Sequence, residues 1–138
     1  MSAGNFFDAF KADMPNCVHD LASDVMKLVL TNVAPVATDS TLSDLTQIAS
    51  GNGYTTDGQV LDNQTSTQTS GTYTMGVDNE VFTASGGTMA TWRYVAMYNS
   101  TSATDALVMW WDKGTTMILA DGESSTVSFT TSAAFTMT

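Results

Sequence analysis

The feature that most constrains the fold of this chain is a succession of short β-type segments that begins near residue 53. Each segment is rich in β-branched and aromatic residues and is followed by Gly, Asn, Asp or Ser, which favour turns. Seven to nine short strands at this spacing are typical of antiparallel sandwiches and jelly rolls. The sequence therefore predicts a mainly β chain, with a single antiparallel β-sandwich or jelly-roll-like domain over residues 25–138.

Individual segments differ in how much of their surface they are expected to bury. Residues 91–98 are largely apolar on both faces, which predicts a central strand covered on both sides, with strict alternation placing Trp92 on the face of Tyr98. Residues 107–111 predict a second buried strand. Residues 65–70, by contrast, are polar on both faces, and this pattern predicts an edge strand or a loop.

The first 24 residues are predicted to form a helical segment that precedes the β domain. Phe6, Phe7 and Phe10 fall on one side of a helical turn, and Pro15 stops the helix or closely follows it. A helix of about ten residues is marginal on its own. Its apolar side is therefore expected to pack either on the domain or on a partner.

The charge of the chain limits the partners it can bind. Fourteen acidic residues against four basic ones give a net charge of −10, and only 13% of residues are charged. Polarity comes mostly from hydroxyl groups, since Ser and Thr make up 37 of the 138 residues. Four basic residues cannot neutralise a run of phosphates, and no apolar run approaches the ~20 residues that cross a bilayer. We therefore expect neither a nucleic-acid nor a membrane partner.

The chain offers few residues for catalysis or for binding a metal or cofactor. The only histidine, His19, lies two residues from the only cysteine, Cys17, a spacing that does not indicate a protease pair. Zinc sites built from Cys and His need three or four such ligands, and this chain has only one of each. Glu80 and Glu123 are better explained as turn residues than as paired catalytic carboxylates. We expect no enzyme, no cofactor and no metal, although calcium bound by distant loops stays open.

Aromatic residues supply the candidates for contact with a partner. Neighbouring tryptophans in a strand point to opposite faces, so one of the pair at 110–111 is expected in the core and the other in the core or at an interface. In the alternative interpretation, the two tryptophans and Tyr98 form a stacking platform for a sugar. The candidate interface residues are Phe6, Phe7, Phe10, Trp110 and Trp111.

Several segments also form a recognisable order along the chain. Each segment carries a short motif, and the motifs follow one another at characteristic distances. The segments are residues 7–11, 20–30, 42–48, 51–61, 90–99 and 107–114. In this order and spacing they resemble a family of small structural proteins of tailed bacteriophages. The likeness includes Asp20-Leu21, Asp24 and Lys27 of the opening motif. At residues 51–58, Thr56-Asp57-Gly58 stands where the family usually has a further glycine.

The resemblance implies a non-enzymatic virion protein, which we interpret as a capsid decoration (cement) protein. Such a protein binds the major capsid protein on the outer surface of the head as a homodimer or homotrimer. The net charge of −10 favours that outer position, because packaged DNA repels it. The N-terminus has no secretory signal pattern, so synthesis in the host cytoplasm is expected. A tail, baseplate or head–tail component is the first alternative, and a glycan-binding module is the second.

Overall fold

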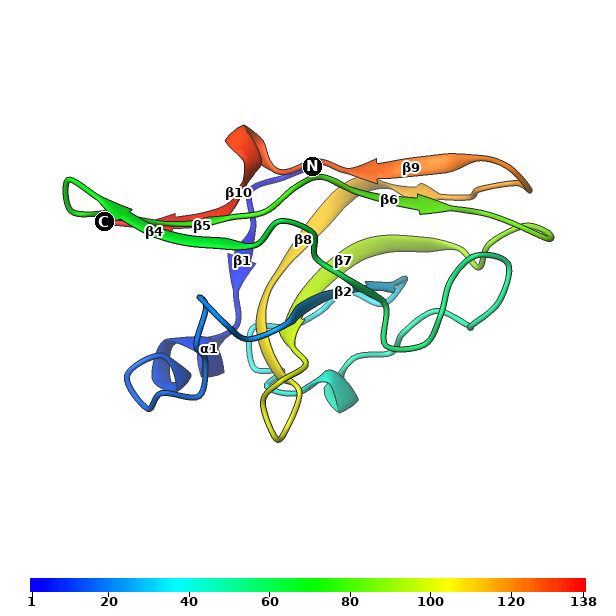
Figure 1. The fold of residues 1–138 in the computed structure, drawn as a ribbon. Coiled ribbons are helices and arrows are strands. Elements are labelled where there is room, and N and C mark those ends of the chain that lie inside the picture. Colours follow the sequence, from blue (N-terminus) through cyan, green and yellow to red (C-terminus); the bar gives the residue numbers. More distant parts are fainter.

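A computed structural model describes residues 1–138 as two β layers with one short α-helix (Figure 1). All strand pairs are antiparallel, which confirms the predicted mainly β fold of sandwich type. The elements are β1 (Asn5–Phe6), α1 (Asp8–Asp13), β2 (Met26–Thr31), η1 (Leu42–Asp44), β3 (Gln59–Val60), β4 (Thr65–Thr69), β5 (Thr72–Gly76), β6 (Glu80–Thr83), β7 (Trp92–Asn99), β8 (Ala106–Met117), β9 (Ser124–Val127), η2 (Thr130–Ser132) and β10 (Ala133–Met137).

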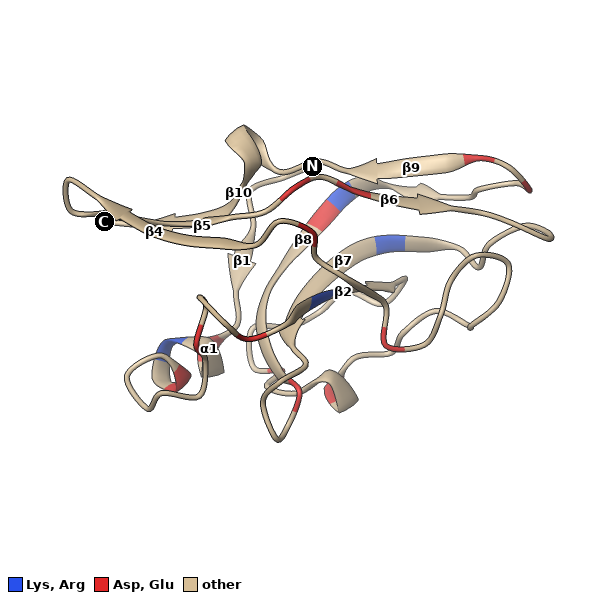
Figure 2. Cartoon of the chain, in the orientation of Figure 1, with Lys and Arg blue, Asp and Glu red and all other residues tan.

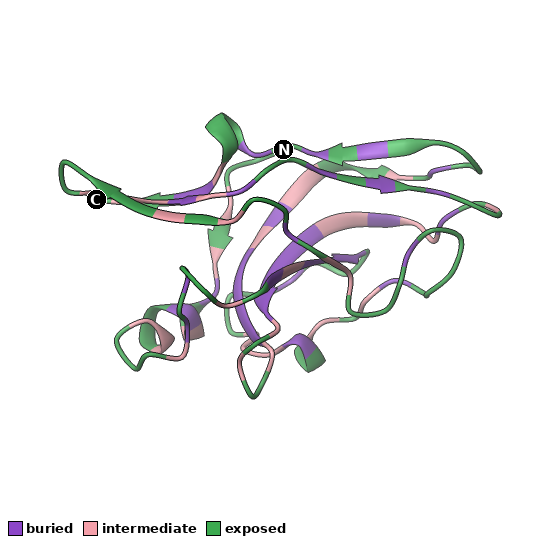
Figure 3. Ribbon diagram, viewed as in Figure 1, coloured by how far each residue is buried: buried purple, intermediate pink, exposed green.

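The first layer is a five-stranded sheet with the order β1-β8-β7-β2-β3. β7 lies at its centre, and five of its eight residues, from Val95 to Asn99, are buried in succession (Figure 3). β2 and β8, on either side of it, are also largely buried along their apolar runs. The predicted central strand, covered on both sides, is confirmed.

The second layer combines a three-stranded sheet, β10-β5-β4, with a two-stranded sheet, β6-β9. β5 runs on into β6 and β9 runs on into β10, so these four strands form one long ribbon that is interrupted at residues 77–79 and at η2 (Figure 1). β4 joins the ribbon through the two-residue turn Ser70-Gly71. Both turn residues have positive φ, 49° and 85°, as a type I′ hairpin turn requires.

The core lies mainly between the two layers. A cluster of 24 buried apolar residues includes Leu28 and Met97 of the first layer and Met75 and Phe82 of the second. A smaller cluster of six, which includes Leu42 of η1, covers the opposite face of the five-stranded sheet. The five-stranded sheet therefore buries both faces along the apolar runs of β2, β7 and β8, whereas the second half of β8 is mostly polar and at least partly exposed.

Trp92 departs from the strict alternation expected along β7. It is fully buried in the core between the layers, with its ring 6.3 Å from that of Phe82, and thus shares a face with Val95 rather than with Tyr98. The register of β7 on β8 shifts between Trp92 and Tyr94. Trp92 pairs with Met117 and Tyr94 with Asp112, so three extra residues lie on β8 at this point. The irregularity interrupts the two-residue alternation of β7, and Trp92 lies on the other side.

The N-terminal helix is shorter than the sequence predicts. α1 contains six residues, and Phe6 lies before it in β1, where it pairs with Met109 of β8. The backbone N–H of Phe7 donates to the carbonyl of Val108 at 3.2 Å, which holds the start of the chain extended against the sheet. The expected helix with all three phenylalanines on one side is therefore wrong, because strand pairing competes with it.

Candidate interaction surface

The five residues expected at an interface lie mostly within the fold of this chain. Phe7, Phe10 and Trp111 are only 0%, 3% and 4% exposed, and Phe6 and Trp110 are half-buried. A partner can reach only the uncovered parts of the last two residues in this conformation. Contact of this set with a partner stays a prediction.

The two neighbouring tryptophans pack on opposite faces of β8, as alternation predicts. Trp110 contacts Phe7, with ring centroids 4.5 Å apart, on the face that carries the smaller cluster. Trp111 meets Phe129 edge-on at 5.3 Å in the core between the layers. Because Tyr98 is only 1% exposed, the sugar-stacking arrangement would need rings that the fold covers.

Phenylalanine rings also pack the N-terminal segment against the second layer. The ring of Phe6 stacks on that of Phe10 at 5.2 Å, with an angle of 4° between their planes. Phe135 of β10 meets both rings edge-on, at 5.1 and 5.7 Å. This aromatic cluster gives the phenylalanines a role in the chain's own packing.

The single histidine belongs to a buried hydrogen-bond network at the end of β7. The amide Nδ2 of Asn99 donates to Nδ1 of His19 at 3.1 Å and to Oδ2 of Asp24 at 2.6 Å. Its Oδ1 accepts from the backbone N–H groups of Thr101 and Ser102 at 2.9 and 3.1 Å. Asn99 is thereby fully satisfied, and it ties residues 19–24 to the turn between β7 and β8.

This network determines what His19 can do chemically. Because Nδ1 accepts from Asn99, the neutral ring carries its proton on Nε2, which lies 3.7 Å from Oδ2 of Asp13 without a hydrogen bond. Burial lowers the pKa of His19, and the carboxylates of Asp13 and Asp24 partly oppose that shift. A ring in this state, closed off from solvent, is a structural group rather than a general base at the surface.

The remaining candidate polar residues take part in turns and loop attachments. Glu80 is buried and accepts from the side chain of Gln59 at 2.8 Å and from the backbone N–H of Asp62 at 2.7 Å. Glu123 accepts from the N–H of Ala120 at 2.8 Å in a turn. No three His, Cys, Asp or Glu side chains are grouped as a metal site would need, and no helix is long and apolar enough to cross a membrane.

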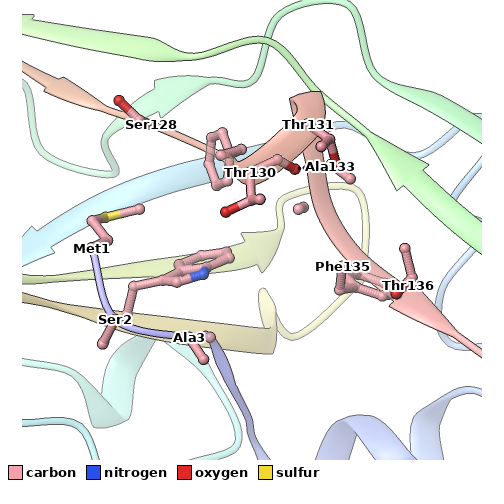
Figure 4. A pocket seen from close by; sticks show the side chains of 13 residues that line it. Met1, Ser2, Ala3, Ser128, Thr130, Thr131, Ala133, Phe135 and Thr136 are labelled. Atoms are coloured by element: carbon pink, nitrogen blue, oxygen red, sulfur yellow. Dashed lines mark hydrogen bonds between the residues drawn. The ribbon is translucent and has the colours of Figure 1, made fainter.

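Two hollows open on the surface near the second layer. One, of about 420 Å³, lies between residues 1–4 and the segment from Ser128 to Thr136, with Trp111 and Phe129 in its lining (Figure 4). The other, of about 540 Å³, lies between residues 14–22 and the inner side of the β4–β5 hairpin. The first has no Asp, Glu, Lys or Arg in its lining, and the second has only Asp20, so neither gathers charged groups for chemistry.

The outer face of the three-stranded sheet is the most regular surface of the molecule. Tyr73, Met75 and Phe135 point inward to the core, so the alternate positions of the same strands point outward. Nearly all of these outward positions are threonine. We call this surface the threonine face, and it consists of Thr65, Thr67 and Thr69 of β4, Thr72 and Thr74 of β5, and Thr136 of β10.

Cross-strand pairing arranges the threonine face in rows. Thr67 pairs with Thr74, which pairs with Thr136 on its other side, and Thr69 pairs with Thr72. The three strands carry no charged residue, in a chain with a net charge of −10, whereas Asp and Glu lie in the loops, the helix and other strands (Figure 2). The surface is therefore neutral, rich in hydroxyl and methyl groups, and exposed along β4 (Figure 3).

Sequence reasoning found part of this surface. It identified residues 65–70 as an edge strand or a loop, and β4 is an edge strand. It did not predict that threonines from three separate segments would share one face. Threonine at alternate positions is a local signal in β4 and β5, but β10 has only Thr136. The pairing of β10 with β5 joins residues about 60 apart and has no local signature.

Comparisons with known proteins add no family to these observations. No family model matches the chain, and no curated protein or solved structure shows significant similarity to it.

Proposed function

We propose that this protein is a non-enzymatic structural component of a tailed-bacteriophage virion, namely a capsid decoration protein. In this role it binds the major capsid protein on the outer surface of the head as a homo-oligomer and stabilises the shell. The observation that carries the proposal is the neutral threonine face on an otherwise acidic molecule. The order of motifs along the chain supplies the virion context.

The distribution of charge suits a protein that is present in many copies on a shell. The acidic loops keep free copies apart through their mutual repulsion. The threonine face adds no such repulsion where it meets a partner, and its hydroxyl and methyl groups offer hydrogen bonds and apolar contact. Because no Lys or Arg lies on the face, its binding to the shell is expected to depend little on salt concentration.

The binding experiment uses phage heads that lack this protein, mixed with the purified chain and sedimented. We expect the unaltered chain to bind at about one copy per capsid subunit, with little change between low and high salt. A double variant, Thr67→Glu with Thr74→Glu, places two charges in the middle of the threonine face, and we expect it to lose binding. Thr115→Glu with Thr116→Glu, at exposed positions of β8, adds the same two charges as a matched control and should bind normally.

Three outcomes would contradict the proposal. Binding that is unaffected by the two glutamates would exclude the threonine face as the contact. A copy number of only a few per virion would contradict the decoration role, and recovery of the chain with tails rather than heads would favour the tail or baseplate alternative. Thermal unfolding of each variant separates loss of binding from loss of fold.

A further inference from the structure

The free edge of β4 differs from the other strand edges of this molecule. β1 and β3, which end the five-stranded sheet, contain two residues each. β10 is irregular, with a register shift between Ala133 and Phe135, and β6 begins with the charged Glu80. On β9, the Nζ of Lys113 donates to the carbonyl of Thr126 at 2.6 Å. Short length, bulges and lysines protect edges from pairing with other chains, and β4 has none of these protections.

The hairpin geometry determines which backbone groups of β4 are free. In a two-residue hairpin the pair next to the turn, here Thr69 with Thr72, exchanges both backbone hydrogen bonds, and such pairs then alternate along the strands. Thr65, Thr67 and Thr69 therefore direct their backbone groups toward β5. Ser66 and Gln68 direct their N–H and C=O groups away from it, and no other backbone group bonds to them. The edge offers two donors and two acceptors.

We infer that two copies of this chain pair edge to edge through β4, antiparallel and around a two-fold axis at Thr67. In this register Ser66 of one copy lies opposite Gln68 of the other, and each such pair exchanges two backbone hydrogen bonds. The two pairs give four bonds, and all free backbone groups of both edges are used. The result is one six-stranded sheet with the order β10-β5-β4-β4-β5-β10.

The side chains of β4 also fit this register. The sequence Thr-Ser-Thr-Gln-Thr is symmetric about Thr67 in its threonines, so threonine meets threonine on the outer face: Thr67 its own copy, and Thr65 the Thr69 of the other. Threonine pairs of this kind stabilise neighbouring strands. No charged residue lies in the pairing strand, so two molecules of net charge −10 can approach here without close like-charge contacts.

The two-fold axis stands perpendicular to the joined sheet, so both threonine faces point to the same side. The inference thus deepens the proposed function, on whose homo-oligomer it rests, by giving that oligomer a surface and a symmetry. The contact is one five-residue strand per copy and is smaller than an ordinary interface of about 1,600 Å². We expect weak association in solution, strengthened where a shell holds copies close together.

The test uses the isolated chain, at concentrations up to about 1 mM, where weak complexes are detectable. Sedimentation at about 0.15 M salt, which screens distant charges more than close ones, should show a monomer–dimer equilibrium. Amide hydrogen exchange at Ser66 and Gln68 should slow as the concentration rises. Thr67→Lys sets two like charges on the axis and should weaken association at least tenfold. Thr72→Lys, with the same charge change on the neighbouring strand, is the control and should associate like the unaltered chain.

A compensating variant tests the register itself. Thr65→Lys combined with Thr69→Asp places opposite charges across both cross-copy pairs and should associate at least as well as the unaltered chain. Thr65→Lys with Thr69→Lys should associate at least tenfold less. A chain that stays monomeric throughout, or a dimer in which exchange at Ser66 and Gln68 is unchanged, would overturn the inference. Neither result bears on head binding, which the sedimentation assay with phage heads measures separately.

Discussion

The five-stranded and the three-stranded sheets of this molecule differ in how many faces of their central strands are buried. β7, at the centre of the first, is mostly buried along its length (Figure 3), and its apolar residues lie on both faces. β5, at the centre of the second, is apolar on one face and carries threonines on the other. Continuous apolar strands commit the first sheet to the interior. Alternating strands leave the second sheet with one face in the core and one exposed, uncharged face. This exposed face is the surface that we propose for contact with partners.

The largest expected effect is a difference in the free energy of unfolding between two truncations, one in each sheet. Leu28→Ala in β2 removes a fully buried side chain from the main core and should lower the free energy of unfolding by about 3 kcal/mol. Thr67→Ala on the threonine face should change it by no more than about 0.5 kcal/mol. Urea denaturation of both variants measures the difference. Equal losses would contradict the distinction between a buried position and one on the exposed face.

The network around Asn99 allows a second, smaller test. Asn99→Ala leaves His19 and Asp24 without their shared donor and the two turn amides without their acceptor. Loss of buried hydrogen bonds of this kind should lower the free energy of unfolding by about 2 kcal/mol. Ser100→Ala, which removes one exposed bond from the same turn, is the control and should cost clearly less. Similar losses for the two would indicate that the network adds little.

The stability should also depend on pH through His19. Because burial lowers its pKa in the folded chain, the unfolded chain binds the proton more readily near the ordinary pKa of 6.5. The free energy of unfolding should therefore fall as the pH drops through and below that value. His19→Gln should remove this part of the pH dependence, and denaturation at pH 5 to 8 compares the two chains. Identical pH profiles would show that His19 does not titrate differently on folding.

The smallest effect concerns the exposed ion pair between β7 and β8. Arg93 donates to both carboxylate oxygens of Asp112 at 2.9 Å, which lowers the pKa of that carboxyl to about 2, with help from the N–H of Gly114. Arg93→Met should raise the pKa of Asp112 toward its ordinary value, as an NMR titration of the carboxyl would record. The pair is partly exposed, so its loss should hardly alter stability. An unchanged pKa would contradict the assigned cause.

Local patterns in the sequence are enough to predict the fold class and the character of the buried strands. The largely apolar segment at residues 91–98 predicts a covered strand, and the two tryptophans of β8 do alternate between faces. Local patterns fail where a distant segment decides the structure. Phe6 pairs with Met109 and so leaves the helix, and an irregularity in the pairing with β8 places Trp92 on the other face.

The threonine face shows the same limit for the candidate site. Two of its strands, β4 and β5, have threonine at alternate positions, which local inspection can find, and β10 adds only Thr136. Their union on one neutral surface depends on the pairing of β5 with both β4 and β10, and on the side of the sheet that Met75 and Phe135 bury. The large aromatic residues that the sequence offers as interface candidates instead bury most of their surface within the chain's own fold.

The orientation of the chain on a phage particle tests the central claim most directly. A cryo-electron microscopy map of the decorated head, at a resolution that separates the two layers, would place each sheet relative to the shell. We predict that the three-stranded sheet lies against the outer capsid surface, with the threonine face in contact and the acidic loops of the five-stranded layer turned to solvent. Density for the chain elsewhere on the particle, or a threonine face turned to solvent, would contradict the account.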